Sequence, residues 1–173
     1  AFFCTPASSN EALLKQCADL GIRSAFIASA GYRESGEAGE LAEASLHRLA
    51  NSLDMLIAGP NGQGVVSTPS SLCLQIVAPY PPVGGISVAS QSGNFVSSFL
   101  NYSQQSGVGI ARAISAGNAT QISIENLLDF FASDDETKVA LTYVENVGNG
   151  ESLLQAMKHI TAVKPLVVLK GGA

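Results

Sequence analysis

Short apolar runs alternate with longer stretches of helical periodicity along almost all of the 173 residues. The runs are rich in Ile, Val, Leu, Phe and Ala, and they do not alternate between apolar and polar residues. Continuous apolar runs are typical of strands covered on both faces, as in a parallel sheet. The strand–helix–strand order therefore predicts βαβ units and an α/β fold. Strands are expected over residues 1–5, 23–29, 55–58, 85–89, 109–115, 138–144 and 165–170, and helices over 8–20, 37–53, 92–106, 121–133 and 150–163.

A proline-rich stretch over 59–84 interrupts this order and leaves room only for a short strand over 71–77. We interpret it as the crossing between two α/β units, with residues 1–64 in the first, 65–83 as a linker and 84–173 in the second. The first unit offers three strands, too few for an independent doubly wound domain. The second offers four strands and three helices, enough for a flavodoxin-like unit.

The composition excludes several classes of protein. Nine Lys and Arg against 14 Asp and Glu give a net charge of −5, whereas a nucleic-acid binder needs a dense cationic face. Cys4, Cys17 and Cys73 form no C-x-x-C pair, which argues against a disulfide scaffold or zinc ribbon and for a reducing cytoplasm. No apolar stretch approaches the roughly 20 residues of a membrane span, so no membrane partner is expected. Charged residues make up only 13%, and both ends lie in apolar runs, so we expect a segment of a longer protein.

The strand-to-helix junctions are the expected places for a ligand, because helix N-termini offer free N–H groups and a positive dipole. The sharpest junction is Ser90-Gln91-Ser92-Gly93-Asn94, which follows an apolar strand and opens a helix. Its free N–H groups can hold a phosphoryl group, although an ordinary N-cap explains the same residues equally well. The spacing is not G-x-S-x-G, which disfavours a hydrolase nucleophile.

Three other junctions carry weaker patterns. Thr5-Pro6-Ala7-Ser8 indicates a helix start capped by Ser8 or Ser9 more than a ligand contact. The small residues Ala28, Ser29, Ala30 and Gly31 would let a ligand approach the backbone closely. Gly59–Gly64 indicates a tight turn, since it fits neither the dinucleotide fingerprint nor the P-loop.

Glu145 leaves an apolar strand at its carboxyl end. A carboxylate at this place can orient a histidine or a metal, or it can cap the next helix. The two histidines, His47 and His159, and the three cysteines show no nucleophile–base arrangement, so structural roles are favoured for all of them.

Four glutamates, Glu34, Glu37, Glu40 and Glu43, recur every three residues, and His47 follows Glu43 at i+4. This pattern favours a solvated helix face, with His47 paired to Glu43, over a metal site, because no His or Asp stands at ligand geometry. No metal site is predicted.

Together these junctions resemble the alpha part of the NDP-forming acyl-CoA synthetases, a family that includes ADP-forming acetyl-CoA synthetase, succinyl-CoA synthetase and ATP-citrate lyase. The resemblance covers nearly all of the chain, and six short motifs in the right order carry it. They are Ser29-Ala30-Gly31-Tyr32-Arg33-Glu34, Gly59-Pro60-Asn61, Ser90-Gln91-Ser92-Gly93, Ser115-Ala116-Gly117-Asn118, Tyr143-Val144-Glu145 and the run from Lys164 to Gly172.

The resemblance implies a partial Rossmann-type CoA-binding domain over 1–64, followed by a flavodoxin-like ligase domain over 84–173 that is truncated at its C-terminus. It implies that Ala28, Ser29, Ala30 and Gly31 touch CoA and that Pro6 lies in a neighbouring loop. It further implies that Glu145 holds a phosphorylated histidine. Finally, it implies a phosphoryl cradle made of Ser90, Gln91, Ser92, Gly93 and Asn94.

In this family an acyl phosphate forms, CoA attacks it, and a histidine carries the phosphoryl group to an ATP-grasp domain. The resemblance therefore implies an acid–thiol ligase with CoA, a carboxylic acid or acyl phosphate, and ATP or ADP with magnesium. It also implies an ATP-grasp domain or beta subunit as partner, and an oligomer. The reactive histidine is expected beyond Ala173, so the isolated chain is expected to be inactive. A further departure is Gly62-Gln63 after Gly59-Pro60-Asn61, where the family usually has Cys or another small residue and then Pro or a hydrophobic residue.

Two other interpretations stay open on the sequence. One is a regulatory module that senses CoA or acyl-CoA within a larger protein, such as an acetyltransferase fusion. The other is an interface segment with no ligand of its own.

Overall fold

The computed structural model describes residues 1–172 and shows two compact units. The first contains residues 1–62 together with 116–122, and the second contains residues 63–115 together with the residues from Ser123 onward. The chain thus leaves the first unit, returns to it for seven residues, and leaves it again.

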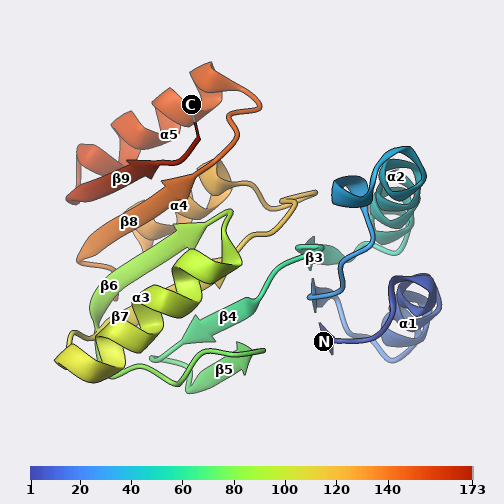
Figure 1. Cartoon of the computed structure of the whole chain (residues 1–173), viewed down its shortest axis with the longest axis horizontal. Helices are drawn as coiled ribbons and strands as arrows, with labels where there is room; N and C mark the ends of the chain where they lie inside the picture. The colour runs from blue at the N-terminus through green and yellow to red at the C-terminus, as the bar shows by residue number, and fades with distance from the viewer. Residues whose placement is uncertain (173) are drawn as a thin grey trace. The chain divides into compact units, whose positions relative to one another are not determined.

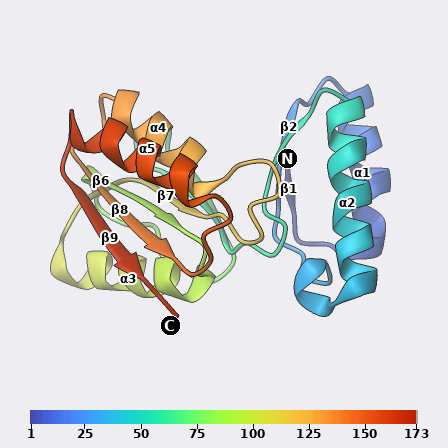
Figure 2. The same cartoon turned by 90° about the horizontal axis from the view of Figure 1, so that it is seen from above.

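The first unit is a three-stranded parallel sheet with two helices (Figure 1). Strands β1 (Phe2–Phe3), β2 (Ser24–Ile27) and β3 (Leu56–Ala58) pair in the order β1-β2-β3. Helices α1 (Ala7–Asp19) and α2 (Glu37–Ser52) cover the same face of this sheet, as Figure 2 shows. A short 3-10 turn, η1 (Arg33–Ser35), leads into α2. Apolar residues of the sheet and helices form one core, which includes Phe3, Leu14, Ile27, Leu46 and Ile57.

The second unit is a six-stranded sheet in the order β5-β4-β7-β6-β8-β9. Strands β6 (Val83–Ser90), β7 (Ile110–Ser115), β8 (Val139–Val144) and β9 (Leu166–Lys170) run parallel, whereas β4 (Gly64–Ser67) is antiparallel to β7 and to β5 (Leu72–Gln75). Helix α3 (Gly93–Ser106) covers one face, and α4 (Ile124–Ser133) and α5 (Gly150–Thr161) cover the other (Figure 2).

Local sequence signals explain where these helices begin and end. Ser123 and Asn126 form a reciprocal capping box at the start of α4. The Asn149 side chain accepts hydrogen bonds from the N–H groups of Glu151 and Ser152, the second and third residues of α5. Helix α3 ends at Gly107, whose left-handed backbone (φ 74°) suits a residue without Cβ.

The predicted α/β fold with a parallel sheet is confirmed. The stretch expected as a linker over 65–83 differs from the expectation, because it supplies β4 and β5 to the second sheet. Pro60 precedes β4, Pro69 falls in the turn between the two strands, and Pro79, Pro81 and Pro82 follow β5. Strand β5 lies within the short strand expected over 71–77, whereas β4, which has only four residues, was not expected.

No helix within residues 1–172 combines the length and the apolar character that crossing a membrane requires.

One largely buried ion pair holds β7 to the segment after α4. Arg112 Nη2 lies 3.0 Å from Asp134 Oδ1, and Thr137 Oγ1 donates to Asp134 Oδ2 at 2.7 Å. The other guanidinium nitrogen of Arg112 donates to Ser67 Oγ on β4. Burial alone raises the pKa of Asp134, but the hydrogen bonds from Thr137 and Arg112 and the Arg112 charge outweigh it, so the pKa is lowered.

A lowered pKa makes this pair a source of pH-dependent stability. The contribution is fully present above the pKa of the unfolded carboxyl, about 4, and is lost as pH falls through the lower folded value. We therefore expect Asp134→Asn to reduce the urea midpoint clearly at pH 6 and much less at pH 3. Asp135→Asn, on an exposed neighbour, is the control and should show the same small difference at both pH values.

Candidate functional site

The start of α3 has the geometry of an anion site. It follows directly from the carboxyl end of β6, and Ser92 caps it, with its Oγ accepting from Phe95 N–H at 3.4 Å. Ser90 Oγ accepts from Ser92 N–H at 3.0 Å, which fixes the turn between strand and helix. Among residues 1–172 no acceptor pairs with the N–H groups of Gly93 and Asn94. Two free donors at the positive end of a 14-residue helix can bind a phosphoryl group.

Gln63 lies over this helix start. Its Nε2 donates to Asn94 Oδ1 at 3.2 Å, and its Oε1 accepts from Ser97 Oγ at 2.5 Å. A Cβ at Gly93 would collide with the Gln63 side chain, so the glycine leaves the room that this amide occupies. Gln63 is one of the two residues at which the sequence departs from the family pattern, and it is not among the predicted site residues.

Glu145 comes to the same edge of the second sheet as residues 90–94, because β6 and β8 are neighbouring parallel strands. Its side chain is exposed, and hydrogen bonds hold both its backbone N–H and its backbone carbonyl. The Glu145 N–H donates to Gln91 Oε1 at 2.7 Å, and Lys170 Nζ donates to the Glu145 carbonyl at 3.0 Å. The Gln91 N–H donates to the Tyr143 carbonyl at 3.1 Å, so this N–H is not available to a ligand.

The small residues after β2 lie beside the start of α1 in the first unit. Ala28 and Ser29 are half-buried, whereas Ala30 and Gly31 are exposed. Ser29 Oγ donates to the Thr5 carbonyl at 2.5 Å and accepts from Asn10 Nδ2 at 3.1 Å, which joins this loop to the β1–α1 junction.

The predicted cap of α1 by Ser8 or Ser9 is wrong. Pro6 occupies the N-cap position, and no side chain caps the helix there. Ser9 Oγ instead donates to the Pro6 carbonyl at 2.7 Å. A proline is tolerated at this place because an N–H group before the first helical turn has no intrahelical acceptor, so its absence loses no hydrogen bond.

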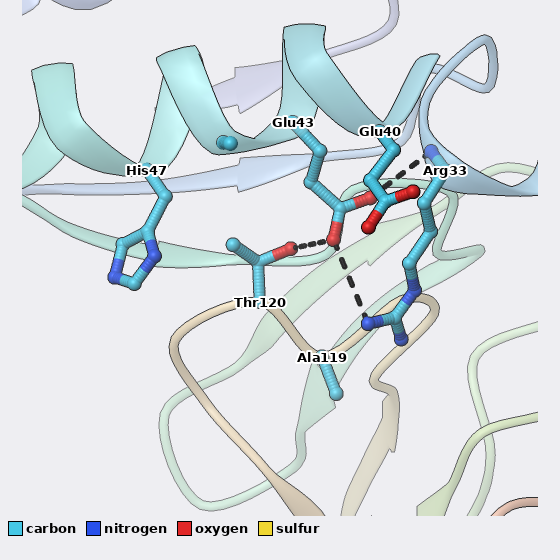
Figure 3. Close-up of a pocket in the computed structure, with 7 residues that line it drawn as sticks. Arg33, Glu40, Glu43, His47, Ala119 and Thr120 are labelled. Atoms are coloured by element: carbon cyan, nitrogen blue, oxygen red, sulfur yellow. Dashed lines mark hydrogen bonds and ion pairs between the residues drawn. The ribbon is translucent and has the colours of Figure 1, made fainter. Parts of the chain in front are cut away.

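Glu43 is buried, so the predicted solvated face of α2 is wrong at this residue. Its carboxylate accepts from Thr120 Oγ1 at 2.6 Å, from Asn118 Nδ2 at 2.7 Å and from Arg33 N–H at 3.2 Å. The Arg33 guanidinium lies 3.8 Å from Glu43 Oε1 (Figure 3). His47 lines the same small pocket but forms no bond with Glu43 in the described part of the chain, contrary to the expected pair.

Glu34 joins this network to the loop after β2. Its Oε1 accepts from the N–H groups of Gly31 (2.6 Å) and Tyr32 (3.0 Å), and its Oε2 accepts from Asn118 Nδ2 (2.7 Å). Burial alone would raise the pKa of Glu34, but these hydrogen bonds outweigh it and lower the pKa, so the carboxylate stays ionised. The Gly31 turn is therefore held through Glu34 and Asn118.

The remaining reactive side chains are His159 and the three cysteines. His159 is in the last turn of α5, on the opposite face of the sheet from α3, and its Nδ1 lies 2.9 Å from Asp129 Oδ1. The three cysteines are free. Within residues 1–172 no group of three or more His, Cys, Asp or Glu side chains is placed to hold a metal ion.

Residues 83–173 match the family model of the succinyl-CoA ligase like flavodoxin domain, which covers more than half of the chain. The chain belongs to the NDP-forming acyl-CoA synthetase family. The matched residues contain the α3 start and Glu145, so both lie in the ligase-type domain that defines the family.

The chain is similar to several ADP-forming synthetases. The chain is 31% identical to acetate–CoA ligase [ADP-forming] I of Archaeoglobus fulgidus, over 99% of this chain and 25% of that protein. It is 31% identical to the alpha subunit of acetate–CoA ligase [ADP-forming] I of Pyrococcus furiosus, over 99% of this chain and 37% of that subunit. The solved acetyl-coenzyme A synthetase 1 of Ca. Korarchaeum cryptofilum, in complex with phosphate and ADP, superposes with a TM-score of 0.93 at 28% identity, over 99% of this chain and 37% of that chain. The chain thus spans roughly a quarter to two fifths of the length of these synthetases.

Proposed function

We propose that this member of the synthetase family contributes the CoA site and the phosphoryl-handling site of an ADP-forming acid–thiol ligase. The observation that carries the proposal is the start of α3, where the free N–H groups of Gly93 and Asn94 lie at the sheet edge that also bears Glu145. A phosphoryl group at this place would be held by backbone donors and by the helix dipole.

The roles of the individual residues follow from this arrangement. Gly93 and Asn94 N–H and the Ser92 hydroxyl would bind phosphoryl oxygens, with Ser90 fixing the turn. Glu145, exposed and with a fixed backbone, would accept the ring N–H of a histidine and hold the tautomer whose other nitrogen takes the phosphoryl group. That histidine would come from a segment outside the present sequence, because His159, the histidine of the second unit, lies on the opposite face of the sheet from α3.

The first unit would bind CoA along Ala28, Ser29, Ala30 and Gly31, beside Pro6. The exposed backbone of Ala30 and Gly31 permits a close approach, and the hydrogen bonds of Ser29 and Glu34 hold the loop ready. A preformed loop loses little conformational entropy when it binds its ligand.

The rest of the reaction needs further parts. ATP or ADP with magnesium would be held by an ATP-grasp domain or a beta subunit, in an oligomer that brings it to the α3 start. The carboxylic acid or acyl phosphate would be bound between the ATP-grasp part and the α3 start. The free thiols of Cys4, Cys17 and Cys73 suit a cytoplasmic enzyme.

A phosphorylation assay tests the proposal. The protein that carries this chain, together with its ATP-grasp part, is incubated with ATP labelled in the γ-phosphate, and acid-labile phosphoryl bound to protein is measured. We expect labelling in the native protein and a loss of roughly tenfold to hundredfold in its rate with Glu145→Gln. Glu151→Gln, on an exposed carboxylate in the first turn of α5, is the control and should leave the rate unchanged.

Calorimetry with CoA tests the first unit separately. We expect binding in the native protein and weaker binding with Gly31→Val, because a side chain at φ 103° is strained and would stand in the path of the ligand. CoA binding without phosphoryl labelling would support the regulatory role instead, and the absence of both would support the interface role.

A further inference from the structure

The Gln91 side chain is joined to the loop that bears Glu145 by three hydrogen bonds. Gln91 Oε1 accepts from the N–H groups of Glu145 (2.7 Å) and Asn146 (2.9 Å), and Gln91 Nε2 donates to the Asn146 carbonyl (2.9 Å). All three bonds cross from the β6–α3 junction to the β8–α5 loop, which lies 54 or 55 residues further along the chain. The amide thus uses its oxygen twice and its nitrogen once on a single dipeptide.

We infer that Gln91 is a positioning residue that sets the place of the Glu145 carboxylate, and that it does not bind the phosphoryl group itself. The inference rests on the proposed function for the role of Glu145, whereas the hydrogen bonds themselves do not depend on it. It replaces the phosphoryl contact that the family resemblance implies for Gln91.

The remaining donors of Gln91 support this assignment. Its backbone N–H donates to the carbonyl of Tyr143, the next-to-last residue of β8. The backbone N–H is therefore not available to a phosphoryl group, and one of the two Nε2 N–H groups is used on the Asn146 carbonyl, whereas the N–H groups of Gly93 and Asn94 have no acceptor within residues 1–172.

The Glu145 segment depends on Gln91 because little else fixes it. Residues 145–150 are all exposed, so no apolar packing orders them. Besides Gln91, Lys170 Nζ holds the Glu145 carbonyl, and Asn149 caps α5. Gln91 holds the peptide units on both sides of Glu145 through their N–H groups, and it thereby fixes the direction in which the Glu145 side chain leaves the backbone.

Gln91 also couples two parts of the site. It directly precedes Ser92, the cap of α3, so one residue joins the phosphoryl-binding helix start to the carboxylate that orients the histidine. Loss of the amide should disturb the Glu145 loop and leave the helix start intact, since Ser92 and Ser90 fix that start independently.

The test uses Gln91→Met, which has nearly the same length and no hydrogen-bonding amide, in the protein that carries this chain. Gln105→Met, on the exposed last turn of α3, is the matched control. Hydrogen–deuterium exchange of the peptide covering residues 144–149 should become roughly tenfold faster in Gln91→Met and stay unchanged in the control. Unchanged exchange in Gln91→Met would overturn the inference.

Phosphorylation kinetics then test the positioning role. We expect Gln91→Met to lower the rate of histidine phosphorylation roughly tenfold while the KM for CoA stays at the native value. Adding Glu145→Gln to Gln91→Met should cause no larger loss than Glu145→Gln alone, because Gln91 acts only through Glu145. Additive losses, or a native rate in Gln91→Met beside a strong loss in Glu145→Gln, would overturn the role.

A different result would show that the proposed function is wrong. In that case Glu145→Gln itself leaves the phosphorylation rate unchanged, whatever the exchange experiment shows. Faster exchange with an unchanged rate in both variants would thus reject the role of Glu145, and with it the positioning role, while the three hydrogen bonds stand.

Discussion

Replacing Gly93 by proline is expected to lower the rate of histidine phosphorylation roughly tenfold to hundredfold and to leave α3 folded. Proline removes one of the two free N–H groups at the helix start, and a hydrogen bond to a charged group is worth about 1.5–3 kcal/mol. The first helical position tolerates proline well, and Ser92 before it already has the extended backbone (φ −90°, ψ 120°) that proline requires. The helix should therefore persist without its donor.

The design must separate the loss of the donor from the added side chain. Any Cβ at Gly93 collides with Gln63, so the proline is combined with Gln63→Ala, which empties that space. Gly93→Ala with Gln63→Ala is the matched control, because it adds the Cβ and keeps the N–H. The rate of labelling and the helical circular dichroism are compared between the two double variants. Equal rates would show that the Gly93 N–H does not bind the phosphoryl group.

Replacing Glu43 by leucine is expected to destabilise the first unit by about 2 kcal/mol, since a donor left without an acceptor costs about 1–3 kcal/mol when buried and less when half-buried, as Thr120 is. The change removes the acceptor of the Thr120 hydroxyl and of the Arg33 N–H, and one of two acceptors of Asn118 Nδ2. Asn118 retains Glu34, so part of the network stays paired.

Urea unfolding followed by circular dichroism measures this effect against two controls. Glu43→Gln keeps the size and one oxygen acceptor, and it should cost about 1 kcal/mol. Glu37→Leu lies on the exposed face of the same helix and should change stability by less than about 0.5 kcal/mol. A Glu43→Leu variant as stable as Glu37→Leu would mean that water satisfies these donors in solution.

The sequence predicted the elements whose signals are local. The apolar runs gave the four parallel strands of the second unit, and Ser92 and Gly93 marked the start of α3. The neighbouring positions of residues 90–94 and Glu145 also follow from local reasoning, because carboxyl ends of adjacent parallel strands meet at one edge.

The residues that escaped prediction depend on partners far along the chain. Glu43 looked like its neighbours Glu37 and Glu40, but two of the donors to its buried carboxylate, Asn118 and Thr120, lie 75 and 77 residues away. The same is true of Gln63, whose partners Asn94 and Ser97 lie more than 30 residues later. No pattern within one helix or one turn carries such information. Gln63 did leave one signal, as a departure from the family motif.

The return of residues 116–122 to the first unit has a consequence for recombination between genes. A crossover at residue 62 would combine Glu43 of one parent with the residues at positions 118 and 120 of another. Only parents that agree at both places would give a chimera with a satisfied network. The first unit and this seven-residue return should therefore be exchanged as one block, although 53 residues of other sequence stand between them.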